Sequence, residues 1–472
     1  MNKYGLYING EWVKTGEECA VVNKATGETA AVVAVAGEKE VAAAVDAAEN
    51  AYKNVKLEPY RRYEILLAAS QILLREQKKI AAALSAEVGK PLKDAMAEVA
   101  RARQTLILSA EEAKRITGDM VPLQGAPACG RRLAFTIRVP VGIVCAITPF
   151  NFPLNLACHK IGPALAAGNA VVYKPATATS LSAVLLCEIF AEAGLPAGYL
   201  NLVMGPGAKV GDLLIREPRI NFYSFTGSPA VGKSLLKNAG FRRVALELGS
   251  NSANIVHEDA DVKKTAELCA RYAFTNAGQV CISCQRVYVH KGIYQQFCQY
   301  AAAYTQNLVL GDPLDPRTDI GPMISEQEAD RADAWLREAV AAGANVLTGG
   351  KRSGAWFGPT ILTDVTADMK VVCQEIFAPI VSFIPYEDIE EAIVQVNDSV
   401  YGLQAGVFTN SLAIARTCAE KIQVGGVIIN DGATFRTDNM PYGGVKESGI
   451  GREGPAYAVK EMTEEKLIVF NF

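Results

Sequence analysis

Residues 221–238 read NFYSFTGSPAVGKSLLKN, an apolar run that passes through a Gly-Ser pair into a helical pattern. The run 221–225 is typical of a strand covered on both faces. Ser228 followed by proline is a common helix start, and the free backbone N–H groups there can hold a phosphate. The pattern is not the ordinary G-x-G-x-x-G turn, and many strand–helix turns resemble it. We therefore expect a strand–helix unit of a parallel sheet, with Gly227 and Ser228 as candidate phosphate contacts.

The same alternation of short apolar runs and helical patterns extends along most of the chain. It predicts right-handed crossovers and two mostly parallel α/β lobes with a cleft between them. Strands are expected at 142–147, 170–174, 199–204 and 221–225, then at 253–256, 286–289, 381–385 and 427–429, with helices at 156–167, 180–193 and 230–238.

The remaining segments predict a hairpin, three long helices and two edge strands. Asn9-Gly10 favours a type I′ turn in a hairpin over 6–13, and helical patterns cover 38–54, 59–88 and 92–117. Residues 131–138 alternate in character, and 464–472 end the chain in an apolar run. Both look like edge strands that need a partner, which predicts oligomerisation.

Composition bounds the class of protein. A chain of 472 residues with 50% hydrophobic and 21% charged residues is long enough for two or three globular lobes. A net charge of -3 with no basic stripe argues against nucleic acid as a partner. We see no signal peptide and no apolar run of membrane-spanning length, so no membrane partner is expected. Eleven cysteines, mostly in apolar surroundings, favour a reducing compartment, and we expect a cytoplasmic location.

One cysteine stands in a different context. In the segment FTNAGQVC, residues 274–281, Cys281 comes three residues after a glycine and can lie on a turn with its sulfur exposed as a nucleophile. A buried core cysteine is the equally plausible alternative. Cys284 completes a C-x-x-C pair, but no second pair and only three histidines exist, so no metal site is expected.

Three polar residues follow expected strands. Glu247 in LELGSN, residues 246–251, would be a general base if burial raised its pKa, or simply a solvent-facing carboxylate. Asn151 in TPFNFP, residues 148–153, could donate to an oxyanion together with the Cys281 backbone amide, or serve as a turn residue. Lys174 could reach a ribose or a 2′-phosphate, or be a solvated loop lysine.

Together these segments resemble the aldehyde dehydrogenase superfamily almost from end to end. The motifs, in the family's order, are PFNFP at 149–153, KP at 174–175, FTGS at 225–228, ELG at 247–249, GQVC at 278–281, QEIFAP at 374–379 and PYGGVKESG at 441–449. The resemblance implies that Cys281 attacks the aldehyde carbon while Asn151 and the Cys281 amide hold the oxyanion. Hydride then leaves for a nicotinamide, and Glu247 activates the water that hydrolyses the thioester to a free acid.

The resemblance also implies NAD or NADP as the cofactor. Its contacts would be Thr148, Pro149, Phe150, Lys174, Thr177, Gly207, Phe225, Gly227, Ser228, Leu248, Glu375 and Phe377. Many NAD-preferring members carry Glu where this chain has Thr177. Without that carboxylate to repel a 2′-phosphate, NADP should be tolerated, and the preference stays open.

The branch most resembled holds the lactaldehyde, non-phosphorylating glyceraldehyde-3-phosphate, and phosphono- and sulfo-aldehyde dehydrogenases. Arg101 and Arg436 match pocket arginines of that branch and would favour an anionic substrate tail; otherwise they are surface or salt-bridged arginines. Val280 stands where phosphate-handling members often have Arg, which favours a sulfonated or small hydroxylated aldehyde. The alternatives are a coenzyme A-acylating enzyme, a non-phosphorylating glyceraldehyde-3-phosphate dehydrogenase, and a catalytically silent relative.

The resemblance further implies the domain organisation. A cofactor-binding domain would comprise 1–118 and 139–245, and a catalytic domain 246–435. Residues 119–138 and 436–472 would form a small β element for assembly into a homodimer or homotetramer.

Overall fold

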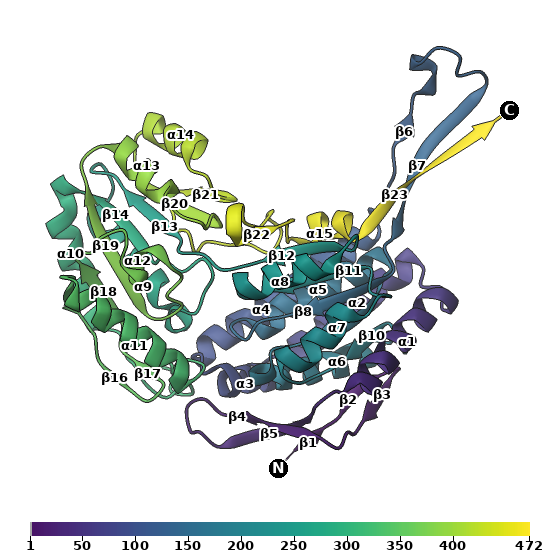
Figure 1. The fold of residues 1–472 in the computed structure, drawn as a ribbon, viewed down its shortest axis with the longest axis horizontal. Helices are drawn as coiled ribbons and strands as arrows, with labels where there is room; N and C mark the ends of the chain where they lie inside the picture. The colour runs from purple at the N-terminus through teal and green to yellow at the C-terminus, as the bar shows by residue number, and fades with distance from the viewer. Residues whose placement is uncertain (1) are drawn as a thin grey trace.

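The computed structural model describes residues 2–472 and contains two large, mostly parallel sheets with helices packed around them, which confirms the expected fold class (Figure 1). The first sheet has the order β22-β12-β11-β8-β9-β10-β2-β3. Its strands are β2 (Leu6–Ile8), β3 (Glu11–Val13), β8 (Ile143–Ile147), β9 (Ala170–Lys174), β10 (Leu200–Leu202), β11 (Phe222–Thr226), β12 (Arg243–Glu247) and β22 (Gly449–Ile450).

The helices of this lobe come from both ends of the chain. They are α1 (Glu38–Asn54), α2 (Pro59–Arg75), α3 (Gln77–Val88), α4 (Leu92–Ala113), α5 (Pro153–Ala167), α6 (Ser180–Glu192), α7 (Asp212–Arg216), α8 (Pro229–Ala239) and α15 (Pro455–Glu461). The single helix expected over 59–88 is wrong, because the chain breaks at Glu76 into α2 and α3. Apolar residues such as Leu73 and Ile80 are buried on both sides of the break, so the hydrophobic pattern carried no signal for it.

The strand order creates a crevice where cofactors bind in such folds. From β8 the chain proceeds to β9 and β10 on one side, then returns to β11 and β12 on the other, and these five strands are parallel. The order therefore reverses between β8 and β11. The carboxyl ends of the strands at such a reversal open a crevice, and the loops that follow β8 and β11 carry PFNFP and TGSP.

The second sheet has the order β15-β18-β19-β14-β13-β20-β21, and all pairs are parallel except β15 with β18. Its strands are β13 (Ala253–Val256), β14 (Arg286–His290), β15 (Asn345–Thr348), β18 (Thr360–Thr363), β19 (Ile380–Tyr386), β20 (Gln404–Phe408) and β21 (Gly426–Ile429). Its helices are α9 (Val262–Phe274), α10 (Lys291–Gln306), α11 (Glu326–Ala341), α12 (Lys370–Cys373), α13 (Ile389–Asn397) and α14 (Leu412–Lys421).

The two sheets face each other with different ends of their strands. Residues 149–152, 226–228 and 247 follow or end strands of the first sheet, whereas residues 248–249, 279–282 and 375–377 precede strands of the second. All of these segments line one cavity. The carboxyl edge of the first sheet therefore faces the amino edge of the second.

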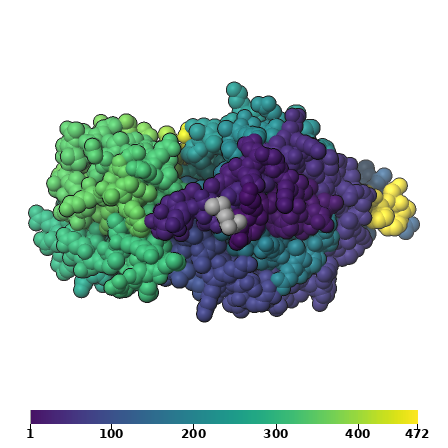
Figure 2. Space-filling view, turned by 90° about the horizontal axis from the view of Figure 1, so that it is seen from below, coloured from purple at the N-terminus to yellow at the C-terminus, as the bar shows by residue number. Residues whose placement is uncertain are grey.

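Two smaller sheets flank the lobes. Strands β1 (Lys3–Tyr4), β4 (Glu18–Val22) and β5 (Thr29–Ala34) form a three-stranded sheet that lies across the lower surface (Figure 2). Short strands β16 (Arg352–Ser353) and β17 (Trp356–Phe357) form a hairpin on the second lobe. The expected tight turn between β2 and β3 is confirmed, since Asn9 and Gly10 have φ of 52° and 83°.

A three-stranded arm projects from the first lobe (Figure 1). It consists of β6 (Met120–Val121), β7 (Arg132–Pro140) and β23 (Thr463–Asn471) in the order β23-β7-β6. The prediction that residues 131–138 form an edge strand is wrong, because β7 is the central strand and pairs with β23 over its whole length. The alternation that suggested an open edge belongs to a strand that is paired on both sides, with the short β6 just before it and with β23 near the end of the chain.

Candidate active site

A cavity of about 510 Å³ lies between the two lobes. Its wall contains Cys281, Glu247 and Asn151, together with Arg101 and Arg436. The catalytic and substrate candidates of the sequence are thus brought to one place. A concave site of this size, with a few converging polar groups in a mainly apolar wall, is typical of a small-molecule site.

The loop that presents Cys281 has an unusual backbone. After α9 the chain turns through Asn276, Ala277 and Gly278, which have φ of 52°, 53° and 70°. At Gly278 a Cβ atom would lie 2.0 Å from the carbonyl oxygen of Ala378, so only glycine fits. The turn leaves the Cys281 side chain partly exposed to the cavity rather than packed in the core.

The electrostatic surroundings of Cys281 favour its neutral form in the free protein. Burial raises the pKa of the thiol to about 11, and the charges of Glu375 and Glu247 add to that rise. A hydrogen bond with Tyr442 and the charge of Arg436 act in the opposite direction. The Tyr442 hydroxyl lies 2.9 Å from the sulfur.

Asn151 is held by a buried ion pair. Its carbonyl oxygen accepts a hydrogen bond from Lys90 Nζ at 2.7 Å, and Lys90 pairs with Glu98 at 2.5 Å. The second Glu98 oxygen accepts the backbone N–H groups of Leu154 and Asn155 at the start of α5. The Asn151 side chain donates through Nδ2 to the carbonyl oxygen of residue 279, at 3.0 Å. An amide has two such N–H groups, so one remains for an oxygen in the cavity.

Glu247 ends β12 with one carboxylate oxygen unpaired. Among residues 2–472, Glu247 Oε2 has no hydrogen-bond partner although it is buried. Burial raises the pKa of Glu247 well above its ordinary value, and the charge of Glu453 raises it further. An unpaired carboxylate with a raised pKa on a cavity wall is suited to proton transfer.

The cofactor candidates fall into two groups. Those that line the cavity are Pro149, Phe150, Gly227, Ser228, Leu248, Glu375 and Phe377. The others lie outside its wall, mostly in β11 or after strands at the carboxyl edge of the first sheet, and are Thr148, Lys174, Thr177, Gly207 and Phe225. The strand order reverses at this same edge, between β8 and β11.

The start of α8 has the features expected of a phosphate contact. Ser228 is the N-cap, and its hydroxyl accepts the Val231 backbone N–H at 3.5 Å. At Gly227 a Cβ atom would lie 2.5 Å from the Phe225 ring. The helix therefore offers free N–H groups at a position where the backbone can be approached closely.

The opposite wall of the crevice comes from the second lobe. Glu375 accepts the Ser250 backbone N–H at 3.0 Å, and burial raises its pKa to about 7. Phe377 has φ of 48°, and its ring meets Phe150 edge-on with centroids 5.9 Å apart. An aromatic pair and a carboxylate facing a helix N-terminus fit a dinucleotide, with apolar walls at one end and a phosphate contact at the other.

Lys174 and Thr177 lie farther along the sheet edge and are the residues predicted to contact the adenosine part of the cofactor. Burial lowers the pKa of Lys174 to about 8, and its ammonium group donates to the carbonyl oxygen of Pro175 at 3.2 Å. The Thr177 hydroxyl, in the 3-10 turn Thr177–Thr179, donates to the carbonyl oxygen of Gly205 at 2.9 Å. Gly207 begins the π-helical turn Gly207–Gly211. The Thr177 hydrogen bond thus joins the two loops.

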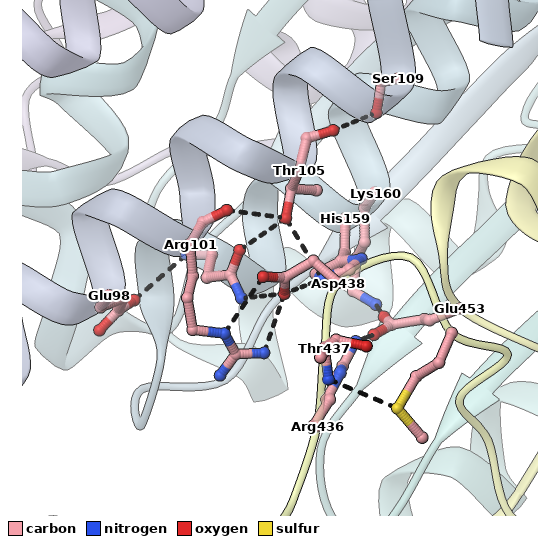
Figure 3. Close-up of polar contacts among 12 residues, drawn as sticks. Glu98, Arg101, Thr105, Ser109, His159, Lys160, Arg436, Thr437, Asp438 and Glu453 are labelled. Carbon is pink, nitrogen blue, oxygen red and sulfur yellow. Dashed lines mark hydrogen bonds and ion pairs between the residues drawn. The ribbon is translucent and has the colours of Figure 1, made fainter. Parts of the chain in front are cut away.

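Arg101 faces a carboxylate held by several donors (Figure 3). Its guanidinium binds Asp438 through two hydrogen bonds, of 2.8 and 3.2 Å. Asp438 also lies 2.9 Å from His159 Nε2 and accepts from Asn155 Nδ2 at 3.1 Å. The Arg101 side chain remains 35% exposed.

Arg436 is more deeply enclosed. It pairs with Glu453 at 3.0 Å, and the other Glu453 oxygen pairs with Lys160 at 2.8 Å (Figure 3). Its guanidinium lies over the Tyr442 ring, 3.7 Å from the centroid. The side chain is only 7% exposed. Both arginines are thus salt-bridged, as one interpretation of the sequence had it, and both also line the cavity.

Sequence reasoning missed the residues that hold these groups. Asp438 and Glu453 have no motif of their own, and Lys160 reads as an ordinary helix lysine. Tyr442 lies in the motif PYGGVKESG, residues 441–449, but nothing in that motif indicates contact with a sulfur. Cys284, the second cysteine of the C-x-x-C pair, does not line the cavity, because its side chain is fully buried and Asn254 Nδ2 lies 2.9 Å from its sulfur.

The described part of the chain holds neither a membrane-spanning helix nor a metal-binding cluster. Residues 2–472 contain no helix long and apolar enough to cross a membrane. In the same part of the chain, no group of three or more His, Cys, Asp or Glu side chains is placed to hold a metal ion.

Comparison with known proteins agrees with this geometry. The 3-sulfolactaldehyde dehydrogenase of Priestia megaterium is 53% identical over 471 residues, which cover 100% of this chain and 98% of that protein. The lactaldehyde dehydrogenase of Methanococcus maripaludis is 39% identical, covering 99% and 100%. A solved structure described as an NADP-dependent enzyme of E. coli has a TM-score of 0.96 at 36% identity, covering 100% and 98%.

A family model covers almost the whole chain. The description "Aldehyde dehydrogenase family" matches residues 12–468, a range that includes the cavity and the cofactor crevice. With the site geometry and the similar proteins above, the chain belongs to the aldehyde dehydrogenase family and is an oxidoreductase that acts on an aldehyde with NAD or NADP.

Proposed function

We propose that the substrate is a short, hydroxylated aldehyde with a singly charged anionic tail, of the sulfolactaldehyde type, and that the product is the free acid. The charges of Arg101, Arg436, Lys160, Asp438 and Glu453, a polar cluster shown in Figure 3, carry this proposal. Glu98, also drawn there, is paired with Lys90 and stands outside the cluster. Arg101, Arg436 and Lys160 are paired with only two carboxylates, those of Asp438 and Glu453.

The cluster therefore holds one positive charge more than its partners neutralise. Burial lowers the pKa of His159, with the charge of Arg436 adding to that effect, so the histidine is neutral. Asp94, another carboxyl group on the cavity wall, has its pKa raised by burial. One excess cation balances a sulfonate or carboxylate, whereas a doubly charged phosphate would be left with an uncompensated charge.

Arg101 is the cation best placed to meet the tail. More than a third of its side chain is exposed, and its bidentate contact with Asp438 fixes the guanidinium plane. Arg436 lies deeper, between this tail site and Cys281, because it stacks on the tyrosine that contacts the sulfur. This arrangement supports a substrate whose charged end is a few atoms from its aldehyde. The similar sulfolactaldehyde and lactaldehyde dehydrogenases support the same size class.

In the proposed mechanism the Cys281 thiolate attacks the aldehyde carbon. The oxygen of the resulting thiohemiacetal would accept the unused N–H of the Asn151 amide and the Cys281 backbone N–H. Within residues 2–472 that backbone N–H donates to no other group. Such donors stabilise charge only as it develops, which lowers the barrier rather than the energy of the bound aldehyde.

NAD or NADP, when bound, would supply the hydride acceptor that oxidises the thiohemiacetal carbon on Cys281 to a thioester. Phe150 and Phe377 would confine the ring end of the cofactor, and Ser228 with the start of α8 would face its phosphates. The Glu375 carboxylate would accept a hydrogen bond from a ribose hydroxyl in place of the one from the Ser250 N–H.

Glu247 would then take a proton from water, and the water oxygen would attack the thioester carbon. Sulfur leaves as the thiolate, and the free acid is released. The unpaired carboxylate oxygen of Glu247 and its raised pKa support this residue as the base. A buried base positioned for this step favours hydrolysis over transfer of the acyl group to coenzyme A.

We also propose that NADP is accepted alongside NAD. Thr177 is neutral, and Lys174, whose lowered pKa of about 8 still leaves it mostly protonated at pH 7, would attract a 2′-phosphate. A glutamate at position 177 would repel the 2′-phosphate.

The proposed assembly is a homodimer or homotetramer joined through the arm, on which Leu133, Leu467 and Phe470 are exposed. The proposed domains remain 1–118 with 139–245, 246–435, and 119–138 with 436–472. Eleven free cysteines support a reducing, cytoplasmic setting.

The test is a substrate panel on the purified enzyme with each cofactor. Sulfolactaldehyde, lactaldehyde, succinic semialdehyde and glyceraldehyde-3-phosphate should be compared by kcat/KM without coenzyme A. Singly charged aldehydes should exceed both the neutral and the doubly charged one. Preference for glyceraldehyde-3-phosphate would contradict the charge argument, and a requirement for coenzyme A would contradict hydrolysis.

A further inference from the structure

We propose that Tyr442 is a catalytic residue whose hydroxyl donates a hydrogen bond to the Cys281 sulfur and stabilises the thiolate that attacks the aldehyde. The inference rests on the proposed role of Cys281 as nucleophile. It starts from one contact, the 2.9 Å between the Tyr442 hydroxyl oxygen and the Cys281 sulfur.

This contact is exclusive on both sides. Within the described chain, the Tyr442 hydroxyl and the Cys281 sulfur have no other hydrogen-bond partner. Tyr442 is 2% exposed although it lines the cavity. A thiolate can only accept a hydrogen bond, and the tyrosine must then be the donor. Hydrogen bonds to charged groups are stronger than those between neutral groups, so the contact strengthens when the sulfur ionises.

The tyrosine ring is fixed from several directions. Its backbone exchanges hydrogen bonds with Glu453, and its ring packs with Val280, Ile282 and Leu403. On one face the Arg436 guanidinium lies 3.7 Å from the ring centroid. A cation over the ring withdraws electron density and makes the phenol a better donor. The hydroxyl is thus both positioned and polarised toward the sulfur.

The other charged groups around Cys281 make this donor necessary. Glu247, at the end of β12, and Glu375, in the loop before β19, both oppose ionisation of the thiol, as burial does. Arg436 favours ionisation, but it is neutralised in part by Glu453. Tyr442 is therefore the neutral group that can favour the thiolate without bringing a further charge into the cavity.

The experiment measures the thiol directly, without turnover. Full-length protein is alkylated with iodoacetamide over a range of pH, and the rate at Cys281 is followed by peptide mass spectrometry, because ten other cysteines are present. The variant Tyr442→Phe keeps the ring and its contact with Arg436. Its midpoint for Cys281 alkylation should rise by about one pH unit, which corresponds to about tenfold slower reaction below the midpoint.

The matched control is Tyr288→Phe, which removes another buried tyrosine hydroxyl, on β14. Its Cys281 midpoint should equal that of the unaltered protein. A second measurement places 3-fluorotyrosine at position 442. The fluorinated phenol is a stronger donor of the same shape, so the midpoint should fall. A midpoint that stays constant or moves the wrong way in either Tyr442 variant would overturn the proposal.

The two proposals fail in different ways. If Cys281→Ala retained aldehyde oxidation, the proposed function would fail, whatever the alkylation profile. If Cys281→Ala were inactive and the Tyr442 variants kept the original midpoint, only the role of Tyr442 would be wrong.

Discussion

Replacing Arg101 with methionine tests the tail site most directly. The change keeps side-chain length and removes the charge that lies most open to the cavity. Hydrogen bonds to charged groups contribute about 1.5–3 kcal/mol. Because the Arg101 side chain is 35% exposed, solvent screens its charge and the lower value applies. A loss of about 1.5 kcal/mol corresponds to about tenfold in kcat/KM.

The structure adds a reason for a somewhat larger effect. Without Arg101, Asp438 keeps the hydrogen bonds of His159 and Asn155, which favour its ionised form. With those contacts kept, the negative charge of Asp438 would then face the anionic tail. The variant therefore loses an attraction and gains a repulsion, and both affect only a charged substrate.

The assay is steady-state formation of reduced cofactor with sulfolactaldehyde and with lactaldehyde. The neutral aldehyde should change by less than about twofold. Arg101→Lys should be intermediate, since it retains charge but not the bidentate geometry. Arg115→Met, which removes an exposed arginine just after α4 and outside the cavity, is the control. Equal losses for both aldehydes in Arg101→Met would refute the tail site.

Other parts of the site give further predictions. Cys281→Ala should abolish cofactor reduction with an unchanged melting temperature; measurable turnover would exclude Cys281 as nucleophile. Glu247→Gln should release one burst of reduced cofactor and then stall. In the unaltered enzyme, deacylation should slow as pH falls through the raised pKa of Glu247, because the protonated carboxyl cannot accept a proton; a pH-independent rate in single-turnover experiments would contradict this role. Thr177→Glu should reduce kcat/KM with NADP by more than tenfold while sparing NAD, and equal effects on both cofactors would place the 2′-phosphate elsewhere. Leu467→Asp on the arm should lower the mass measured by light scattering, whereas the equally exposed Val394→Asp on α13 should leave it unchanged; no change in either would exclude the arm as an interface.

The sequence predicted the strand–helix units well because their signals are local. The ends of α1, β9 and β13 agree with the expected ranges, since caps and apolar runs mark them within a few residues. The break at Glu76 was missed because the apolar periodicity continues through it. The central position of β7 was missed because its partner β23 lies near the far end of the chain, and pairing at that distance has no local signal.

The residues of the site also divide into those with a local sequence signal and those without one. Motifs identified Cys281, Glu247 and Asn151 because each stands at a strand end or a tight turn with a recognisable neighbourhood. They could not identify Asp438 or Glu453, whose importance comes from which cations they meet after folding. That the carboxyl edge of one sheet faces the amino edge of the other also follows only from tertiary packing.

The pairing of β22 with β12 has a consequence for synthesis. Gly449 lies beside Glu247 in the sheet, and the Ser448 carbonyl accepts the Leu248 N–H. Ser448 and Gly449 are both synthesised long after Glu247. As the chain leaves the ribosome, the central parallel strands can pair in turn, while the outer edge of β12 stays uncovered. Glu247, the proposed base, therefore reaches its final environment only near the end of translation, and in truncated chains it would be expected to lack these surroundings.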